Sequence, residues 1–203
     1  VYVASNGFNS SSYWARRRDY VARVADCFAG VEVEVVAVVR AQRPFAMALF
    51  SENVKVGRYA QNFARFLKHF DRTMRYGEQL SVWADYFPRL SVFVYEDLRA
   101  SGDLVRALAN VLGLPVGRDW PDAGTLNRSL PADLVEFKRR LNGTTLELES
   151  LREIGGLLAS QSFQSKMELS RRRACWLPIS ELDARLERFA RGNERVRTRW
   201  ARI

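Results

Sequence analysis

The chain has 203 residues, of which 47% are hydrophobic and 12% aromatic, enough for one domain with its own core. This composition excludes a low-complexity or collagen-like protein, and no apolar run reaches the roughly 18 residues of a membrane span. The formal net charge of +9 favours anionic partners such as nucleotides, nucleic acid, acidic glycans or membrane headgroups. Cys27 and Cys175 have no metal or redox spacing, so we expect reduced thiols and a cytoplasmic protein without a metal.

The first part of the chain predicts strands that alternate with helices. A short apolar strand at residues 1–4 and a Ser/Asn/Gly-rich loop precede a basic helix at 13–29. At residues 31–39, alternating Val and Glu give way to an unbroken β-branched run. Such a run is typical of a strand buried on both faces of a parallel sheet, and Arg40 follows it directly.

The remaining elements predict a helical second half. Pro44 suits the start of a helix and Gly57 the residue just past its end, while Ser180 and Asp183 form a capping-box pattern. Further helices are expected near residues 63–70, 76–87, 104–112, 131–141, 144–159 and 180–200, and a third strand at 90–95. The sequence therefore predicts a single α/β domain over residues 1–203, with a small parallel sheet flanked by helices and a helical C-terminal third.

Two expected strands end in polar residues that could bind a ligand. Arg40 ends one strand, and Tyr95, Glu96 and Asp97 end the next. Ligands of open α/β sheets bind beyond the carboxyl ends of the strands. Arg40, with Arg43 close by, stands before a helix N-terminus and could clamp an anion. The alternative is that Arg40 merely ends its strand and pairs with a surface carboxylate.

Five segments together resemble one family. They read VVAVVRAQRPFAMALFSENVKVG, DRTMRYGEQLSVWADYF, VFVYEDLRASGDLVRALANVLGL, NRSLPADLVEFKRRLN and LERFARGNERVRTRW. In this order they are similar to sulfotransferases that use 3′-phosphoadenylyl sulfate (PAPS), and above all to the bacterial group that modifies capsular or other cell-surface saccharides. The resemblance implies a P-loop-nucleotide-binding-like fold and a sulfuryl transfer from PAPS to a hydroxyl of a saccharide or glycolipid.

The resemblance also implies a set of donor-binding residues. In the family, the arginine that corresponds to Arg40 and a serine eight residues later grip the 3′-phosphate, and a tyrosine corresponding to Tyr95 lies against adenine. Position 48 is alanine here, and Ser51 lies one helical turn further on, where a bridging water could connect it to the phosphate. The donor-binding candidates are therefore Arg40, Arg43, Ser51 and Tyr95.

The sulfuryl half of the family's site has no counterpart in these residues. The family's lysine-containing phosphosulfate loop is expected upstream of Val1, which predicts an N-terminally incomplete domain. Asn6 stands where bacterial members often carry a glutamate base, and we expect His69, the chain's one histidine, to be structural or solvated. The catalytic residues are thus unassigned.

Two other functions compete with sulfuryl transfer. A degenerate member of the family could act as a non-catalytic binding or scaffold protein, which Ala48 and Asn6 favour. A basic nucleic-acid-binding module is the second alternative, motivated by the net charge. Scattered arginines and the absence of a groove-binding motif argue against it, so we expect no nucleic-acid partner.

Overall fold

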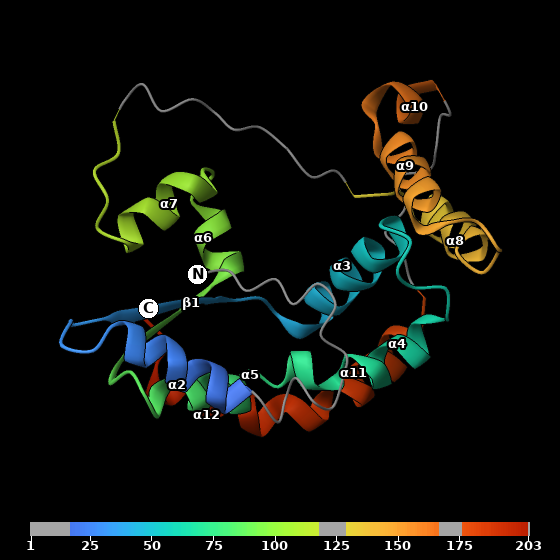
Figure 1. Ribbon diagram of the computed structural model, residues 1–203. Coiled ribbons are helices and arrows are strands. Elements are labelled where there is room, and N and C mark those ends of the chain that lie inside the picture. The colour runs from blue at the N-terminus through green and yellow to red at the C-terminus, as the bar shows by residue number, and fades with distance from the viewer. Residues whose placement is uncertain (1–16, 118–128, 167–175, 203) are drawn as a thin grey trace. The chain divides into compact units, whose positions relative to one another are not determined.

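The computed structural model describes residues 17–117, 129–166 and 176–202 (Figure 1). Over these residues the chain is mixed α/β, mostly helical, with a two-stranded parallel sheet. This confirms the predicted class and the small parallel sheet. The more specific sulfotransferase fold stays a prediction.

The chain divides into two compact units, each built from segments that are distant in sequence. Among the described residues, the sheet unit comprises residues 17–41, 69–116 and 188–202, and the helical unit comprises residues 42–68, 117, 129–166 and 176–187. The expectation of a single domain stays a prediction.

The sheet unit holds the two described strands together with helices from all three of its segments. Its elements are α2 (Arg17–Cys27), β1 (Glu34–Val39), η1 (Asp71–Met74), α5 (Tyr76–Ala84), β2 (Arg89–Val94), α6 (Tyr95–Ala100), α7 (Leu104–Val111) and α12 (Ala190–Arg199). The strands pair in parallel from Glu34 opposite Arg89 to Val39 opposite Val94. On the other side of β2, the Val92 N–H donates to the Trp200 carbonyl at 2.8 Å, which joins the end of the chain to the sheet.

One face of β1 packs into the core and the other does not. Val35, Ala37 and Val39 pack against a cluster formed by Leu80, Leu90, Val92 and Val196, from α5, β2 and α12. Val38 lies on the opposite face and its side chain is 43% exposed. The prediction that this strand is buried on both faces is therefore wrong, because only one face of the described sheet is covered by apolar side chains.

A contact between two glycines sets how closely α5 and α12 pack. A Cβ added at Gly77 would lie 2.8 Å from the Gly192 carbonyl oxygen and 3.0 Å from its Cα. Real Cβ atoms do not approach this closely, so the two backbones touch only because position 77 has no side chain. Gly77 is buried, and the same helix supplies Leu80 to the core.

The helical unit is organised around aromatic side chains. Its elements are α3 (Gln42–Lys55), α4 (Phe63–His69), α8 (Ala132–Leu141), α9 (Leu148–Ala159), α10 (Gln161–Lys166) and α11 (Ile179–Leu186). The Phe50 ring of α3 makes edge contacts with Phe63, Phe66 and Trp176, with centroids 5.1, 5.3 and 4.9 Å away. These rings form the centre of the unit.

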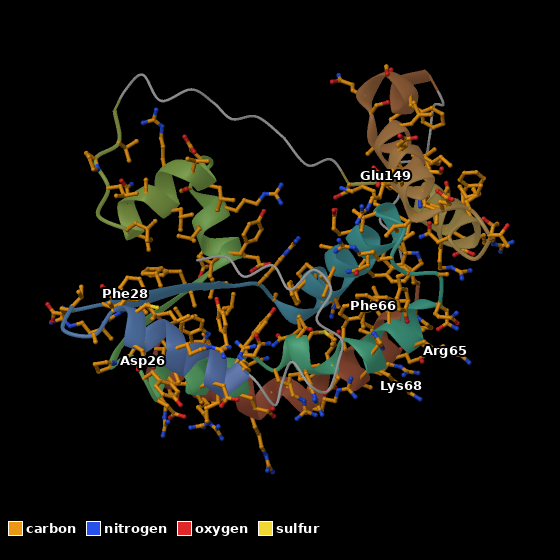
Figure 2. The ribbon with its side chains drawn as sticks, viewed as in Figure 1. Asp26, Phe28, Arg65, Phe66, Lys68 and Glu149 are labelled. Atoms are coloured by element: carbon orange, nitrogen blue, oxygen red, sulfur yellow. The ribbon has the colours of Figure 1, made fainter. Side chains whose placement is uncertain are left out.

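Arg65 and Lys68, on the same α4 helix as Phe66, are exposed (Figure 2). The predicted amphipathic helix near residues 63–70 is thus confirmed, with its phenylalanines inside and its basic residues outside.

The long helix predicted at residues 180–200 is instead three elements: α11, the 3-10 turn η2 (Glu187–Phe189) and α12. The predicted capping box is wrong, since Pro178 precedes α11 and Ser180 lies inside the helix. Asp183 instead accepts hydrogen bonds from the Arg43 guanidinium. The short helix α6 begins at Tyr95, directly after β2.

Replacing Gly77 by alanine is expected to destabilise the protein by about 1–3 kcal/mol, the usual cost of overpacking, because the new Cβ collides with backbone atoms of Gly192. Gly156→Ala is the matched control, since this helical glycine is exposed and a Cβ there meets nothing within 4 Å. Helix propensity alone should make that variant equally or more stable, by up to about 1 kcal/mol. Urea unfolding of both variants measures the difference, and equal stabilities would refute the proposed packing constraint.

Candidate functional site

The parallel register brings Arg40 and Tyr95 together at the carboxyl edge of the sheet. Val39 and Val94 are partners at the ends of β1 and β2, so the residue after each strand emerges at the same edge. The Arg40 guanidinium carbon lies over the Tyr95 ring, 5.0 Å from its centroid. This is cation–π geometry, which fixes the direction of the arginine side chain.

Glu96 gives Arg40 a carboxylate neighbour. The Arg40 Nε atom lies 3.6 Å from Glu96 Oε1, an ion-pair distance too long for a hydrogen bond. The other oxygen of Glu96 accepts from the Ala41 backbone N–H at 3.2 Å. Arg40 Nε is buried and donates no hydrogen bond to any described residue. The sequence-based alternative, in which Arg40 pairs with a carboxylate, is therefore seen in the structure.

The backbone of Arg40 is also held in place. Its carbonyl oxygen accepts a hydrogen bond from the Tyr76 hydroxyl at 2.8 Å, which ties the end of β1 to α5. The Arg40 side chain is 31% exposed, and within the described residues its terminal nitrogens have no hydrogen-bonding partner. The Tyr95 ring, the Glu96 carboxylate and the hydrogen bond to the Arg40 carbonyl thus hold the guanidinium in place, and its terminal nitrogens can donate to an anion from solvent.

The other two predicted donor-binding residues belong to the helical unit. Arg43, in the first turn of α3, donates from Nε to Asp183 Oδ1 at 2.9 Å, and its Nη2 atom lies 2.5 Å from Asp183 Oδ2. Ser51 lies half-buried further along α3. The structure therefore brings together Arg40 and Tyr95, and it gives Arg43 a carboxylate partner that an anion would have to displace.

His69 and Lys55 have ordinary surroundings. His69 is exposed and lies edge-on to Phe70, with ring centroids 5.1 Å apart. Lys55 pairs with Glu52 at 2.7 Å in the last turn of α3, in keeping with a role at the helix end. Asn6 and the Arg171–Arg172–Arg173 run lie outside the described residues.

An apolar groove of about 280 Å³ lies at the opposite, amino edge of the sheet. Phe28, Val31, Val33, Tyr86 and Phe87 are among the residues that line it. Figure 2 shows Phe28 just beyond the end of α2. The two charged residues of the groove pair with each other, since Arg89 Nη2 lies 2.5 Å from Glu32 Oε1. The groove thus presents no free charge to a phosphate, which leaves the carboxyl edge as the better nucleotide candidate.

The burial of Lys138 in the helical unit was not predicted from the sequence. Lys138 of α8 is 0% exposed, and its Nζ donates to Asn142 Oδ1 and, at 3.5 Å, to the Val54 carbonyl. Asn142 donates in turn to the carbonyls of Val54 and Tyr59, at 2.8 and 2.9 Å. These side chains satisfy the Val54 carbonyl at the C-terminus of α3, where a positive charge is favourable, and the Tyr59 carbonyl in the segment that follows.

Burial lowers the pKa of Lys138 to about 8. A usable signal existed in the sequence, because Lys138 follows Leu134 by four residues and Val135 by three, on the buried stripe of α8. Its position in a Lys-Arg-Arg run instead favours a solvated side chain, because runs of basic residues usually lie at the surface.

Within residues 17–117, 129–166 and 176–202, no group of three or more His, Cys, Asp or Glu side chains is placed to hold a metal ion. None of the described helices has the length and apolar character needed to cross a membrane. Comparison with family models, with curated proteins and with solved structures finds no match to this chain. A functional assignment has to rest on the residues described above.

Lys138 is expected to make the stability depend on pH between about 8 and 10.5. Its folded-state pKa lies below the unfolded value of 10.5, so on acidification the unfolded chain takes up the proton first. Stability therefore rises with pH through this window, by at most about 1.4 kcal/mol per pH unit, and below the window this group makes no contribution to its pH dependence.

Urea unfolding from pH 7 to 10 should show the wild type gaining stability relative to Lys138→Met as the pH rises. Lys68→Met, which removes an exposed lysine of α4, is the control and should run parallel to the wild type. A constant difference between wild type and Lys138→Met would contradict the assignment.

Neutralising Glu96 is expected to strengthen anion binding at Arg40. Glu96→Gln removes the competing negative charge, so the affinity for inorganic phosphate should rise several-fold. Asp97→Asn changes the net charge equally at the neighbouring exposed position and should have a smaller effect. Phosphate titration followed through the NMR signal of the Arg40 Nε–H group measures both, and identical affinities in the two variants would contradict a local competition.

Proposed function

We propose that this chain is part of a PAPS-dependent sulfotransferase and that Arg40 and Tyr95 hold the adenosine 3′-phosphate part of the donor. The observation that carries the proposal is the Arg40 guanidinium seated over the Tyr95 ring at the common carboxyl edge of two parallel strands. Open α/β sheets place their ligand sites at this edge.

The chemistry of the pair suits a nucleotide. A guanidinium recognises phosphate through paired N–H donors, and the planar Tyr95 ring offers a surface for an aromatic base. The two groups are in contact, so one ligand that carries both a phosphate and a base could engage them together. Glu96 opposes the anion but also orients Arg40 and binds the Ala41 N–H, which keeps the guanidinium in place when no ligand is bound.

The proposed reaction moves a sulfuryl group from a phosphate oxygen of the donor to a hydroxyl oxygen of the acceptor. The sulfur–oxygen bond to the phosphate breaks, a new one forms to the acceptor, and the hydroxyl proton passes to a base. The saccharide or glycolipid acceptor comes from the resemblance of the sequence segments. Arg43 is engaged with Asp183, so the donor-binding proposal depends on Arg40 and Tyr95 rather than on Arg43 or Ser51.

A non-catalytic nucleotide-binding protein is the second candidate, favoured by Ala48 and Asn6 in place of the family's hydroxyl and base. It would share the donor site and lack the transfer. A labelled-sulfate transfer assay with PAPS and a panel of saccharides separates the two. Transfer supports the enzyme, whereas donor binding without transfer to any acceptor supports the binding protein.

Arg40→Ala is expected to weaken the binding of adenosine 3′,5′-bisphosphate at least about tenfold, a loss of about 1.4 kcal/mol or more. Isothermal titration calorimetry measures it, with Arg99→Ala as control because Arg99 is an exposed arginine of α6 with the same charge. Equal losses in the two variants would reduce the effect to net charge. A wild-type protein that does not bind the nucleotide would overturn the proposed function.

A further inference from the structure

The last helix of the sheet unit carries a row of exposed arginines. Arg191, Arg195 and Arg199 follow one another at four-residue intervals on α12, and all three are exposed. Residues four apart share a helix face and rise by about 6 Å along its axis. We call these three residues the arginine stripe.

The positive excess of the sheet unit comes from this end of the chain. Residues 188–202 contain six arginines and one glutamate, whereas residues 17–41 and 69–116 together contain nine arginines and ten acidic residues. Glu194 is already engaged, at 2.6 Å from Arg197, and Arg188 pairs with Asp71 at 2.9 Å. The stripe arginines form no ion pair with a described residue, so their charge is directed to solvent.

The helix that carries the stripe is firmly packed. Val196 is buried in the core cluster, Trp200 packs against that cluster, and Gly192 meets the backbone of Gly77 on α5. The end of the helix is tied to β2, because the Arg202 N–H donates to the Val92 carbonyl at 2.9 Å. The spacing of the stripe is therefore set by a fixed helix and not by a loop.

The other exposed side chains of α12 indicate which classes of anionic partner the stripe fits. Besides the stripe, the exposed residues of α12 are Ala190, Glu194, Arg197 and Thr198, so the surface has no large apolar side chain to enter a membrane interface. It also has no exposed aromatic ring of the kind that stacks bases in single-stranded nucleic acids. A linear chain of carboxylates or sulfates matches the stripe in charge and in its extended shape, and arginine binds such groups in bidentate fashion.

We propose that Arg191, Arg195 and Arg199 form a docking surface for a linear anionic polysaccharide. The inference goes beyond the proposed donor site and uses none of its residues. It rests on the proposed function only in taking a saccharide as the backbone that carries the charges. Such a surface would hold a long acidic chain on the protein through contacts that do not involve the reacting hydroxyl.

The test compares two variants of equal charge in the full chain. Arg191→Gln/Arg195→Gln/Arg199→Gln removes the stripe, and Arg23→Gln/Arg89→Gln/Arg99→Gln removes three exposed arginines from α2, β2 and α6. Polygalacturonate and chondroitin sulfate are the probes, titrated at physiological ionic strength without nucleotide. We expect the stripe variant to bind at least about tenfold more weakly and the control to stay within about twofold of wild type.

A third variant and two further probes make the outcome specific. Arg191→Lys/Arg195→Lys/Arg199→Lys keeps the charge and loses the bidentate geometry, so its affinity should fall between wild type and the glutamine variant. Thermal unfolding verifies that all three variants fold. Equal losses in stripe and control variants, no binding of either polysaccharide, or tighter binding of oligothymidylate or phosphatidylserine vesicles would each overturn the proposal.

The donor site is tested separately from the stripe. Binding of adenosine 3′,5′-bisphosphate by the stripe variant should equal that of wild type. A wild-type protein that does not bind this nucleotide would overturn the proposed function. The polysaccharide result would remain valid in that case, because it is measured without nucleotide.

Discussion

The parallel pairing of β1 and β2 is the constraint on which the candidate site depends. Parallel strands deliver their carboxyl ends to one edge, and the register from Glu34–Arg89 to Val39–Val94 makes both strands end at the same level. A register shifted by one residue would turn Arg40 or Tyr95 to the other face and separate them. The covered face of β1, packed on α5 and α12, is what fixes this register, since Val35, Ala37 and Val39 must face the core.

Charge compensation then separates arginines that serve the fold from those available to a ligand. Arg43 is held by Asp183 through two nitrogens, and an anion gains little there because it must replace a carboxylate already in contact. Arg40 has a weaker partner, with its Nε atom 3.6 Å from Glu96. The α12 stripe has no carboxylate partner among the described residues. Availability to an anion thus depends on the spacing of neighbouring acids more than on net charge.

The sequence was sufficient for features that depend on local patterning. The β-branched run before Arg40, the phenylalanines of α4 and the parallel sheet followed from periodicity, and so did Arg40 and Tyr95 as strand-end residues. The exposure of Val38, the ion pair of Arg43 with a residue 140 positions away and the burial of Lys138 did not. Each depends on which distant segment covers a given face, and nothing in the local residue pattern specifies that.

Lys138 and Arg40 show how one kind of charge takes two roles in this chain. Lys138 is fully buried with neutral oxygens as partners, so desolvation lowers its pKa to about 8 and its role is to complete the end of α3. Arg40 cannot lose its proton in this way, because a guanidinium stays charged at any physiological pH. At a strand end open to solvent, Arg40 keeps this charge and has Glu96 as a carboxylate neighbour, with 3.6 Å between Arg40 Nε and Glu96 Oε1. If the edge binds a nucleotide as proposed, the phosphate would compete with Glu96 for the Arg40 guanidinium.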